Sequence, residues 1–508
     1  MYELNIPMLP GECWYGFCVD DGQQFPLHAG SQYQRDIDPN PTNNQASPLL
    51  LSSAGRYVWS ERGFALTAKD GLLSISSRKS EILLRESFGT LREAFLEAAA
   101  QHFPANGALP PKGFFVKPQY NTWIELIYDQ NQEDVLQYAR NIIKNGLPAG
   151  ILMIDDGWAD YYGRWEFNRS TFPNPKAMVD ELHDMGFEVM LWVCPFISPD
   201  SVEMKNLHKQ GLLVRTVDGE PAVRKWWNGY SAVLDFTNPE AENWFDAQLK
   251  NLMSCYGIDG FKFDAGDGIY YDENDITCAP IDCNGQTELW VKFGQRYQYN
   301  EYRACFGCGG LALVHRLADK NHSWDSNGVS ALLPNQLAQG IIGLAFTCPD
   351  MIGGGEYSSF LANSDKLDEE LFVRYAQCAA LMPMMQFSAA PWRVLTAKNA
   401  ELCKKAAALH CHYASYIWEL AQQAAFTGEP IVRYMEYQFP HMGLEKVIDQ
   451  FMLGDRVLVA PVYGKSICSR TVMLPPGKWK YVDGSIYEGG RAEVAAPLDV
   501  LPYFERME

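Results

Sequence analysis

Acidic side chains follow several short apolar segments of this 508-residue chain. The segment ILMI runs into Asp155 and Asp156, GFKF into Asp264 and AFTCP into Asp350, and Asp319 comes three residues after LALVHR. A single Asp after a strand can simply cap the next helix. Several of them at the ends of parallel strands would meet at one rim, where one carboxyl group could attack an anomeric carbon and another could protonate the leaving oxygen of a glycoside.

Lys262 and Asp264 are two residues apart in a predicted strand and therefore point to the same face. A cation beside a carboxylate keeps the carboxylate ionised, as a nucleophile requires. Two other interpretations stay open: a structural ion pair inside the fold, and a Schiff-base lyase in which Lys262 is the nucleophilic amine. The lyase needs a lowered lysine pKa, whereas the neighbouring Asp264 would raise the pKa of Lys262.

The elements that would position these groups alternate between residues 113 and 442. Short apolar strands are predicted at 150–155, 188–193, 260–264, 311–316 and 345–350, with helices between them, for example at 132–146, 175–186 and 240–257. More than five such units predict a closed (β/α)8 TIM barrel, an α/β fold. Residues 1–112 predict an N-terminal β-sandwich domain that ends in a helix, and residues 443–508 a small C-terminal β-sandwich domain.

Composition excludes several classes of partner. Acidic residues outnumber basic ones by 62 to 42, a net charge of −20 that opposes nucleic acids and anionic membrane surfaces. The first residues, MYELNIPMLPGECW, show no basic region followed by an apolar one, and 13 cysteines are scattered along the chain. These features predict a reduced, cytoplasmic compartment, with an already removed signal and self-association left open.

Metal and cofactor motifs are weak in this sequence. Cys305 and Cys308 form a single CxxC pair, and the nine histidines show no HxH or HExxH spacing. The segment IGGGE (352–356) lacks the Lys-Ser/Thr of a phosphate loop, and its glycines more simply let a loop approach a substrate. We therefore expect neither a metal ion nor a cofactor.

Five segments together resemble glycoside hydrolase family 31. They are IDDGW, KWWNGYSAVLDFTNPEA, DGFKFDAGD, CPDMIGGG and DQFMLGDRVLVAPV, in the family's order from about residue 115 to 480. The resemblance implies a retaining two-step mechanism with an Asp nucleophile after the fourth barrel strand. By the same resemblance, Asp264 is the nucleophile.

The acid/base position departs from the family pattern. Family members usually carry Trp-x-Gly-Asp followed five residues later by Trp, and the matching text here is RLADKNHSW, with Asp319 and Trp324 at that spacing. The resemblance thus implies Asp319 as the acid/base, with Asp325 as the rival. The replaced Trp and Gly leave open a non-catalytic, carbohydrate-binding barrel.

Within the family, the segments CPDMIGGG and MPMMQFSAAPW most resemble those of an α-galactosidase-like branch. That resemblance implies a substrate that is an oligosaccharide or a simple α-glycoside, and a sugar pocket in which tryptophan faces stack on the ring and polar groups bind its hydroxyls. Core packing is the alternative for Trp192 and Trp227. α-Glucosidase, α-xylosidase and sulfoquinovosidase activities remain alternatives. The implied pocket residues are Trp123, Asp155, Asp156, Trp192, Trp227, Lys262, Arg303 and Asp350.

Overall fold

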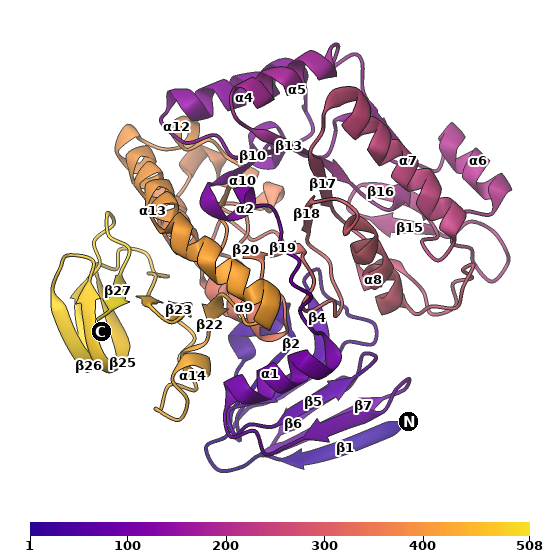
Figure 1. Ribbon diagram of the computed structural model, residues 1–508. Helices are drawn as coiled ribbons and strands as arrows, with labels where there is room; N and C mark the ends of the chain where they lie inside the picture. The colour runs from indigo at the N-terminus through magenta and orange to yellow at the C-terminus, as the bar shows by residue number, and fades with distance from the viewer. Residues whose placement is uncertain (508) are drawn as a thin grey trace.

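Eight short parallel strands form the centre of the computed structural model, which describes residues 1–507 (Figure 1). They pair in the order β20-β19-β18-β17-β13-β10-β9-β21. The ring closes beyond β20, where the N–H of Ile352 donates to the carbonyl of Gln386 at 2.9 Å. The predicted TIM barrel is confirmed. Its strands are β9 (Gln119–Asn121), β10 (Ile151–Ile154), β13 (Glu188–Val193), β17 (Gly260–Phe263), β18 (Tyr299–Tyr302), β19 (Val314–Arg316), β20 (Thr347–Cys348) and β21 (Gln386–Phe387).

Burial on both faces explains why five of these strands can be predicted. Every residue of β10 and β17 is buried, so the strands are continuous apolar runs with no alternation. The strands β9, β18 and β21 have the sequences QYN, YNEY and QF, and they too are buried almost throughout. Because they are short and carry polar side chains into the barrel interior, their sequences have no strand signature.

Helices pack around the barrel, and several of them begin at side-chain caps. Asn131, Asn174 and Asn238 each accept a hydrogen bond from a backbone N–H of the first turn of the helix that follows. Those helices, α4 (Gln132–Lys144), α5 (Pro175–Asp184) and α7 (Pro239–Tyr256), confirm the predicted ones. The other long helices are α8 (Cys283–Gly294), α9 (Val329–Ile341), α11 (Glu369–Ala380) and α13 (Ala397–Thr427), and the shorter ones are α2 (Gly113–Val116), α3 (Trp123–Leu126), α6 (Val202–Gln210), α10 (Tyr357–Ala362) and α12 (Pro391–Val394).

The N-terminal part is a sandwich of two four-stranded antiparallel sheets, ordered β1-β7-β6-β3 and β2-β4-β5-β8. Apolar side chains from both sheets, including Ile6, Leu66, Trp14 and Val58, meet in one core. The predicted helix follows as α1 (Leu91–His102). The strands are β1 (Tyr2–Pro7), β2 (Trp14–Cys18), β3 (Tyr33–Asp36), β4 (Ala46–Ser52), β5 (Tyr57–Ser60), β6 (Ala65–Lys69), β7 (Leu72–Ser77) and β8 (Ile82–Arg85).

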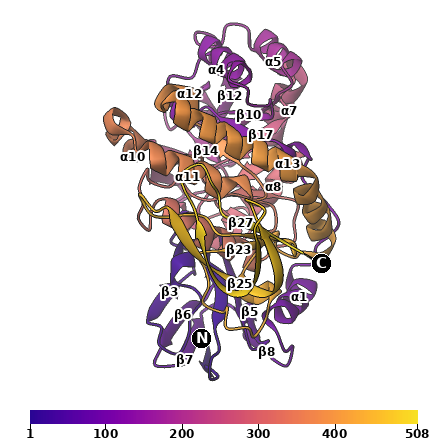
Figure 2. The same cartoon turned by 90° about the vertical axis from the view of Figure 1, so that its left-hand side faces the viewer.

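The C-terminal part lies beside α13 and the barrel (Figure 2). Where a small β-sandwich is expected, six strands hydrogen-bond into one antiparallel sheet, ordered β22-β23-β24-β27-β25-β26, with its own apolar core. The sheet begins before residue 443; the domain boundaries stay predictions. Its elements are β22 (Val432–Arg433), α14 (Met435–Gln438), β23 (Phe451–Leu453), β24 (Val457–Val459), β25 (Ser469–Tyr481), β26 (Ile486–Ala495) and β27 (Tyr503–Arg506).

Two small insertions follow the second and third barrel strands. The hairpin β11 (Ala159–Tyr161) and β12 (Arg164–Phe167) comes after β10, and the sheet of β14 (Phe196–Ile197), β15 (Val223–Trp226) and β16 (Gly229–Val233) comes after β13. Both lie on the side of the barrel where its strands end. Within residues 1–507, no helix meets the length and hydropathy that crossing a bilayer demands.

Candidate active site

A cavity of about 240 Å³ opens at the carboxyl ends of the barrel strands. Nine of the ten predicted site residues line this cavity. They come from the segments that follow β9, β10, β17, β18 and β19, from the strands β13 and β17, and from the β15–β16 hairpin. The full lining is Asn43, Trp123, Asp155, Asp156, Trp192, Trp227, Lys262, Asp264, Arg303, Ala318, Asp319, Glu356 and Tyr357.

Asp264 follows β17, the fourth barrel strand, and its carboxylate is held by donors on both oxygens. Oδ1 accepts hydrogen bonds from Arg303 Nε at 3.0 Å and from the N–H of Ala265 at 2.8 Å, and Oδ2 accepts one from Trp192 Nε1 at 2.9 Å. Burial opposes ionisation, but the charges of Arg303, Lys262 and Arg316 and the bond from Trp192 outweigh it and hold the pKa of Asp264 well below its usual range. Asp264 is therefore an anion with a fixed orientation.

Lys262 lies between two carboxylates on the floor of the cavity. Its Nζ is 2.6 Å from Asp155 Oδ2 and 3.7 Å from Asp264 Oδ2. Burial lowers the pKa of Lys262, yet the charge of Asp155, followed by other carboxylates, raises it above its usual value overall. Lys262 is thus a charged ammonium group, and Asp155 is its main partner.

Arg303 comes directly after β18 and joins the barrel to the N-terminal domain. It forms a two-pronged ion pair with Asp267, with Nη1 and Nη2 at 2.6 and 2.7 Å from the two carboxylate oxygens. Nη1 also donates to the carbonyl of Asn43 at 2.6 Å, and the guanidinium lies 5.3 Å from the ring centroid of Trp227. The planar fork of Arg303 therefore fixes the nucleophile candidate, a supporting carboxylate and one aromatic wall together.

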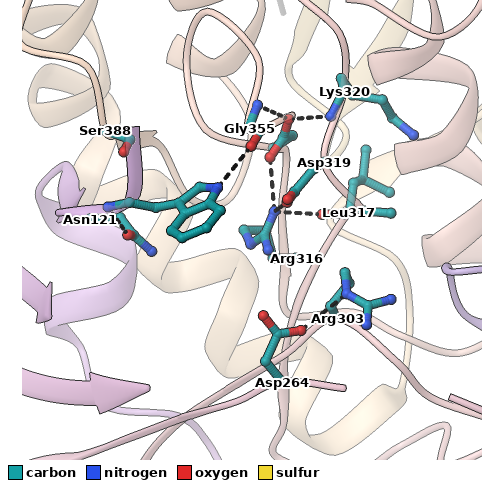
Figure 3. Close-up of polar contacts among 12 residues, drawn as sticks. Asn121, Asp264, Arg303, Arg316, Leu317, Asp319, Lys320, Gly355 and Ser388 are labelled. Carbon is teal, nitrogen blue, oxygen red and sulfur yellow. Dashed lines mark hydrogen bonds and ion pairs between the residues drawn. The ribbon is translucent and has the colours of Figure 1, made fainter. Parts of the chain in front are cut away.

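Asp319 lines the cavity nearer its mouth. Its side chain keeps 34% of its surface exposed, and Oδ1 accepts a hydrogen bond from Arg316 Nη1 at 2.7 Å. Figure 3 shows this contact, with Asp264 and Arg303 further down in the view. Asp325, the rival, is exposed; its carboxylate accepts from Ser323 Oγ and from the N–H of Asn327 and does not line the cavity.

Asp350, predicted to bind sugar hydroxyls, is the one predicted residue that does not line the cavity. It is completely buried. Its Oδ1 accepts from Arg316 Nη1 at 2.8 Å, and its Oδ2 accepts from the N–H groups of Lys320 and Gly355 at 2.6 and 2.7 Å. The segment after β20 turns this carboxylate towards the protein interior, behind Asp319.

Asp156 is the buried carboxyl group of the cavity whose pKa is raised. Its Oδ2 accepts from Tyr162 Oη at 3.0 Å and from Asn228 Nδ2 at 2.6 Å. Burial, followed by the charge of Asp155, raises the pKa of Asp156 to about 7. The two adjacent Asp residues thus differ in their surroundings: Asp155 is paired with Lys262, whereas Asp156 holds a proton up to neutral pH.

Three of the four aromatic residues of the lining are tryptophans. Trp123 and Trp192 are buried, and Trp123 Nε1 donates to the carbonyl of Gly355 at 3.0 Å. Trp192 bonds Asp264 through its ring nitrogen, so its position serves the site as well as the core. Trp227 is 45% exposed, which makes it a wall at the mouth of the cavity.

Sequence reasoning missed four lining residues and two supporting ones. Glu356 and Tyr357 directly follow the glycine-rich IGGG, a signal that was present, and Asp267 lies within the quoted motif DGFKFDAGD. Asn43 belongs to the other domain, more than 200 residues before Asp264, and no local signal marks it. The missed residues are Asn43, Ala318, Glu356 and Tyr357 in the lining, and Asp267 and Arg316 behind it.

Fold and cavity together define a (β/α)8-barrel protein with a carboxylate-rich site at its strand ends. The model of the glycosyl hydrolase family 31 TIM-barrel domain matches residues 109–420, and that of the family's C-terminal domain matches residues 428–508. The chain belongs to glycoside hydrolase family 31. In residues 1–507, no three His, Cys, Asp or Glu side chains are grouped as a metal ion would need.

Relatives of several kinds match the chain. The myogenesis-regulating glycosidase of Mus musculus is 34% identical over 419 residues, which cover 80% of this chain and 58% of that protein. Alpha-glucosidase 2 of Bacillus thermoamyloliquefaciens is 24% identical, covering 74% of this chain and 50% of that protein. The chain thus spans about half the length of these relatives.

Solved structures share the fold over almost the whole chain. A family 31 dextranase of Flavobacterium johnsoniae complexed with glucose superposes with a TM-score of 0.86 at 21% identity, covering 99% of this chain and 66% of that one. A family 31 sulfoquinovosidase from E. rectale, in complex with an aza-sugar inhibitor, gives 0.85 at 18% identity, with 99% and 82% covered. These likenesses establish the fold.

Proposed function

We propose that this chain is a retaining exo-α-glycosidase in which Asp264 is the nucleophile and Asp319 the acid/base. One observation carries the proposal: an ionised, fully oriented carboxylate and a partly exposed one line the same small cavity. In the first step Asp264 attacks the anomeric carbon while Asp319 donates a proton to the leaving oxygen. In the second step Asp319 takes a proton from water, which attacks the glycosyl-enzyme and releases the sugar with its configuration retained.

The size of the cavity supports exo action. Its volume of about 240 Å³ lies below the roughly 300–1,000 Å³ of pockets for drug-sized ligands, which suits a single terminal sugar unit. Trp227, Asp319 and Asn43 are the exposed parts of the lining, so the leaving group would extend past them towards solvent.

The charge of the cavity favours a neutral sugar. Lys262 pairs with Asp155, and Arg303 pairs with Asp267 and Asp264, so both cations that line the cavity already have carboxylate partners. A sulfonate or carboxylate substituent would have to displace one of these pairs. This argues against a sulfoquinovoside as substrate. The α-galactosidase-like motifs of the sequence favour an α-galactoside over an α-glucoside or α-xyloside.

The Schiff-base alternative is disfavoured by the same contacts. An amine nucleophile must lose its proton, whereas Asp155 at 2.6 Å raises the pKa of Lys262. Borohydride trapping with a carbonyl substrate should therefore give no adduct.

The test is a panel of aryl α-glycosides with galactose, glucose, xylose and sulfoquinovose. The α-galactoside should be cleaved best, and NMR should detect the α-anomer as the first product. Asp264→Asn should lower kcat at least about 10⁴-fold, because no nucleophile remains. Asp246→Asn is the matched control, since Asp246 is a buried carboxylate on α7 outside the cavity. If the folded protein hydrolyses none of these aryl α-glycosides, the result favours a non-catalytic, carbohydrate-binding barrel instead.

A further inference from the structure

Asp319 shares its arginine with the completely buried Asp350. A single nitrogen, Arg316 Nη1, donates to Asp319 Oδ1 at 2.7 Å, to Asp350 Oδ1 at 2.8 Å and to the carbonyl of Leu317 at 2.9 Å. Figure 3 shows Arg316 with its bonds to Leu317 and Asp319. The two carboxylates therefore converge on one nitrogen of one cation, although only Asp319 faces the cavity.

The backbone at Gly355 lies so close to Asp350 and Asp319 that no side chain fits there. A Cβ on Gly355 would lie 2.6 Å from Asp350 Oδ1 and 3.0 Å from Asp319 Oδ1, closer than side-chain atoms pack. The N–H of Gly355 donates to Asp350, as does the N–H of Lys320, the residue after Asp319. Asp350 thus ties the loop that carries Asp319 to the loop after β20.

Arg316 alone would be a poor neighbour for a general acid. A guanidinium in contact with a carboxyl group favours its ionised form and would strip Asp319 of the proton that it must donate. A second carboxylate on the same guanidinium nitrogen offsets that charge. After proton transfer Asp319 is an anion, and Arg316 is already in place to stabilise it.

We propose that Asp350 is a positioning residue which, through Arg316, holds Asp319 in place and keeps it protonated until the glycosidic bond breaks. The inference rests on the proposed function, because it assigns the acid/base role to Asp319. It places Asp350 in the proton-transfer apparatus, in place of the sugar-binding role expected from the resemblance. It also gives a reason for an Arg at position 316, where family members usually have Trp.

Other charges around this group come from several elements, and any pH effect must be judged against them. Burial, followed by the charge of Asp319, raises the pKa of Asp350. Burial lowers the pKa of Lys320, although the charges of Asp20, Asp350 and Asp319 act in the opposite direction. The charged and titratable groups that face Arg316, Asp319 or Asp350 are Lys262 and Asp264 at β17, Glu301 on β18, Lys320 after β19, Cys348 on β20 and Tyr375 on α11; Asp20 of the N-terminal domain faces Lys320.

Two substitutions should move the alkaline limb of the pH profile of kcat/KM in opposite directions. Asp350→Asn removes the offsetting charge, so Asp319 should lose its proton more easily and the limb should shift to lower pH by about one unit. Arg316→Gln removes the cation, and the limb should shift to higher pH. Asp350→Glu should restore most of the wild-type profile, and Asp246→Asn should leave it unchanged.

The leaving group gives a second readout. Asp350→Asn should lower kcat at least about 10-fold more on an alkyl glycoside than on a dinitrophenyl glycoside, since only the alkyl leaving group needs a proton. An equal loss on both substrates, a raised KM and an unmoved limb would mean that Asp350 binds sugar or only supports the fold. If Asp350→Asn does not fold, an unmoved or lowered limb in Arg316→Gln overturns the proposal.

Failure of this inference is distinguishable from failure of the proposed function. If Asp264→Asn retains turnover, or if Asp319→Asn shows no dependence on the leaving group, the catalytic assignment itself is wrong. If Asp264→Asn and Asp319→Asn behave as expected while the alkaline limbs of Asp350→Asn and Arg316→Gln stay in place, only the role proposed for Asp350 is wrong.

Discussion

Asp156 has a chemical environment unlike that of its neighbour Asp155. Its pKa of about 7 in the folded protein arises from burial and from the adjacent charge, whereas an Asp in an unfolded chain titrates near pH 4. The folded state therefore holds a proton that the unfolded state releases. The stability that this group contributes is fully present below about pH 4 and is lost as the pH rises to about 7.

Asp156→Asn should remove this loss, because an amide oxygen can still accept the bonds from Tyr162 Oη and Asn228 Nδ2. The difference in free energy of unfolding between the variant and the wild type should therefore grow in the variant's favour by about 2–3 kcal/mol from pH 5 to pH 8. Thermal unfolding midpoints of both proteins at the two pH values measure the effect. A difference between the proteins that does not change with pH would show that Asp156 is ionised throughout.

How far single residues could be predicted depends on where their partners lie. Asp264 and Lys262 can be recognised because they lie two residues apart at the end of one strand. Asp350 was recognised as a polar group after a strand, but its inward orientation depends on Gly355 and Arg316, which no periodicity reveals. The two-pronged contact of Arg303 with Asp267 likewise joins residues 36 positions apart.

At the scale of elements, a loop of the N-terminal domain between β3 and β4 supports two barrel strands. Gln45 Nε2 donates to the carbonyls of Arg303 and Arg316, the residue after β18 and the last residue of β19. Asn44 Oδ1 accepts from the N–H of Ala318 at 2.7 Å. Five of the barrel strands could be predicted from sequence, but this support could not, because its two sides are more than 250 residues apart.

Gln45→Glu tests this loop with almost no change in shape. The new carboxylate cannot donate to the two carbonyls and would face them with like polarity, at a cost of about 1–3 kcal/mol for each buried group left unpaired. We expect a lower unfolding midpoint and a kcat/KM reduced about 10-fold or more, with the pH limbs unmoved. Gln45→Ala, which leaves room for water, should be milder. If Glu is tolerated as well as Ala, the amide of Gln45 does not position the strand ends.

At the scale of the whole molecule, both flanking domains pack on the barrel. Side chains of the N-terminal sandwich such as Tyr15, Leu49 and Trp59 belong to the same apolar core as the barrel strands. The C-terminal sheet is joined to α11 by Arg374, whose guanidinium donates to the carbonyls of Ile467, Ala496 and Val500. The three parts therefore support one site, and both carboxylates proposed as catalytic come from the barrel.

Arg374→Gln should weaken the whole molecule while sparing the chemistry. Arg374 is 1% exposed, and its loss would leave the buried carbonyl of Ala496 without this donor and remove two part-buried bonds, where each buried group left unpaired typically costs about 1–3 kcal/mol. The unfolding midpoint should fall by several degrees, with kcat at low temperature within about twofold of wild type. Arg456→Gln is the matched control, because Arg456 pairs with Glu419 at the surface, where such pairs contribute about 0–1 kcal/mol. A large loss of kcat in Arg374→Gln below its midpoint would instead indicate that the C-terminal sheet shapes the site.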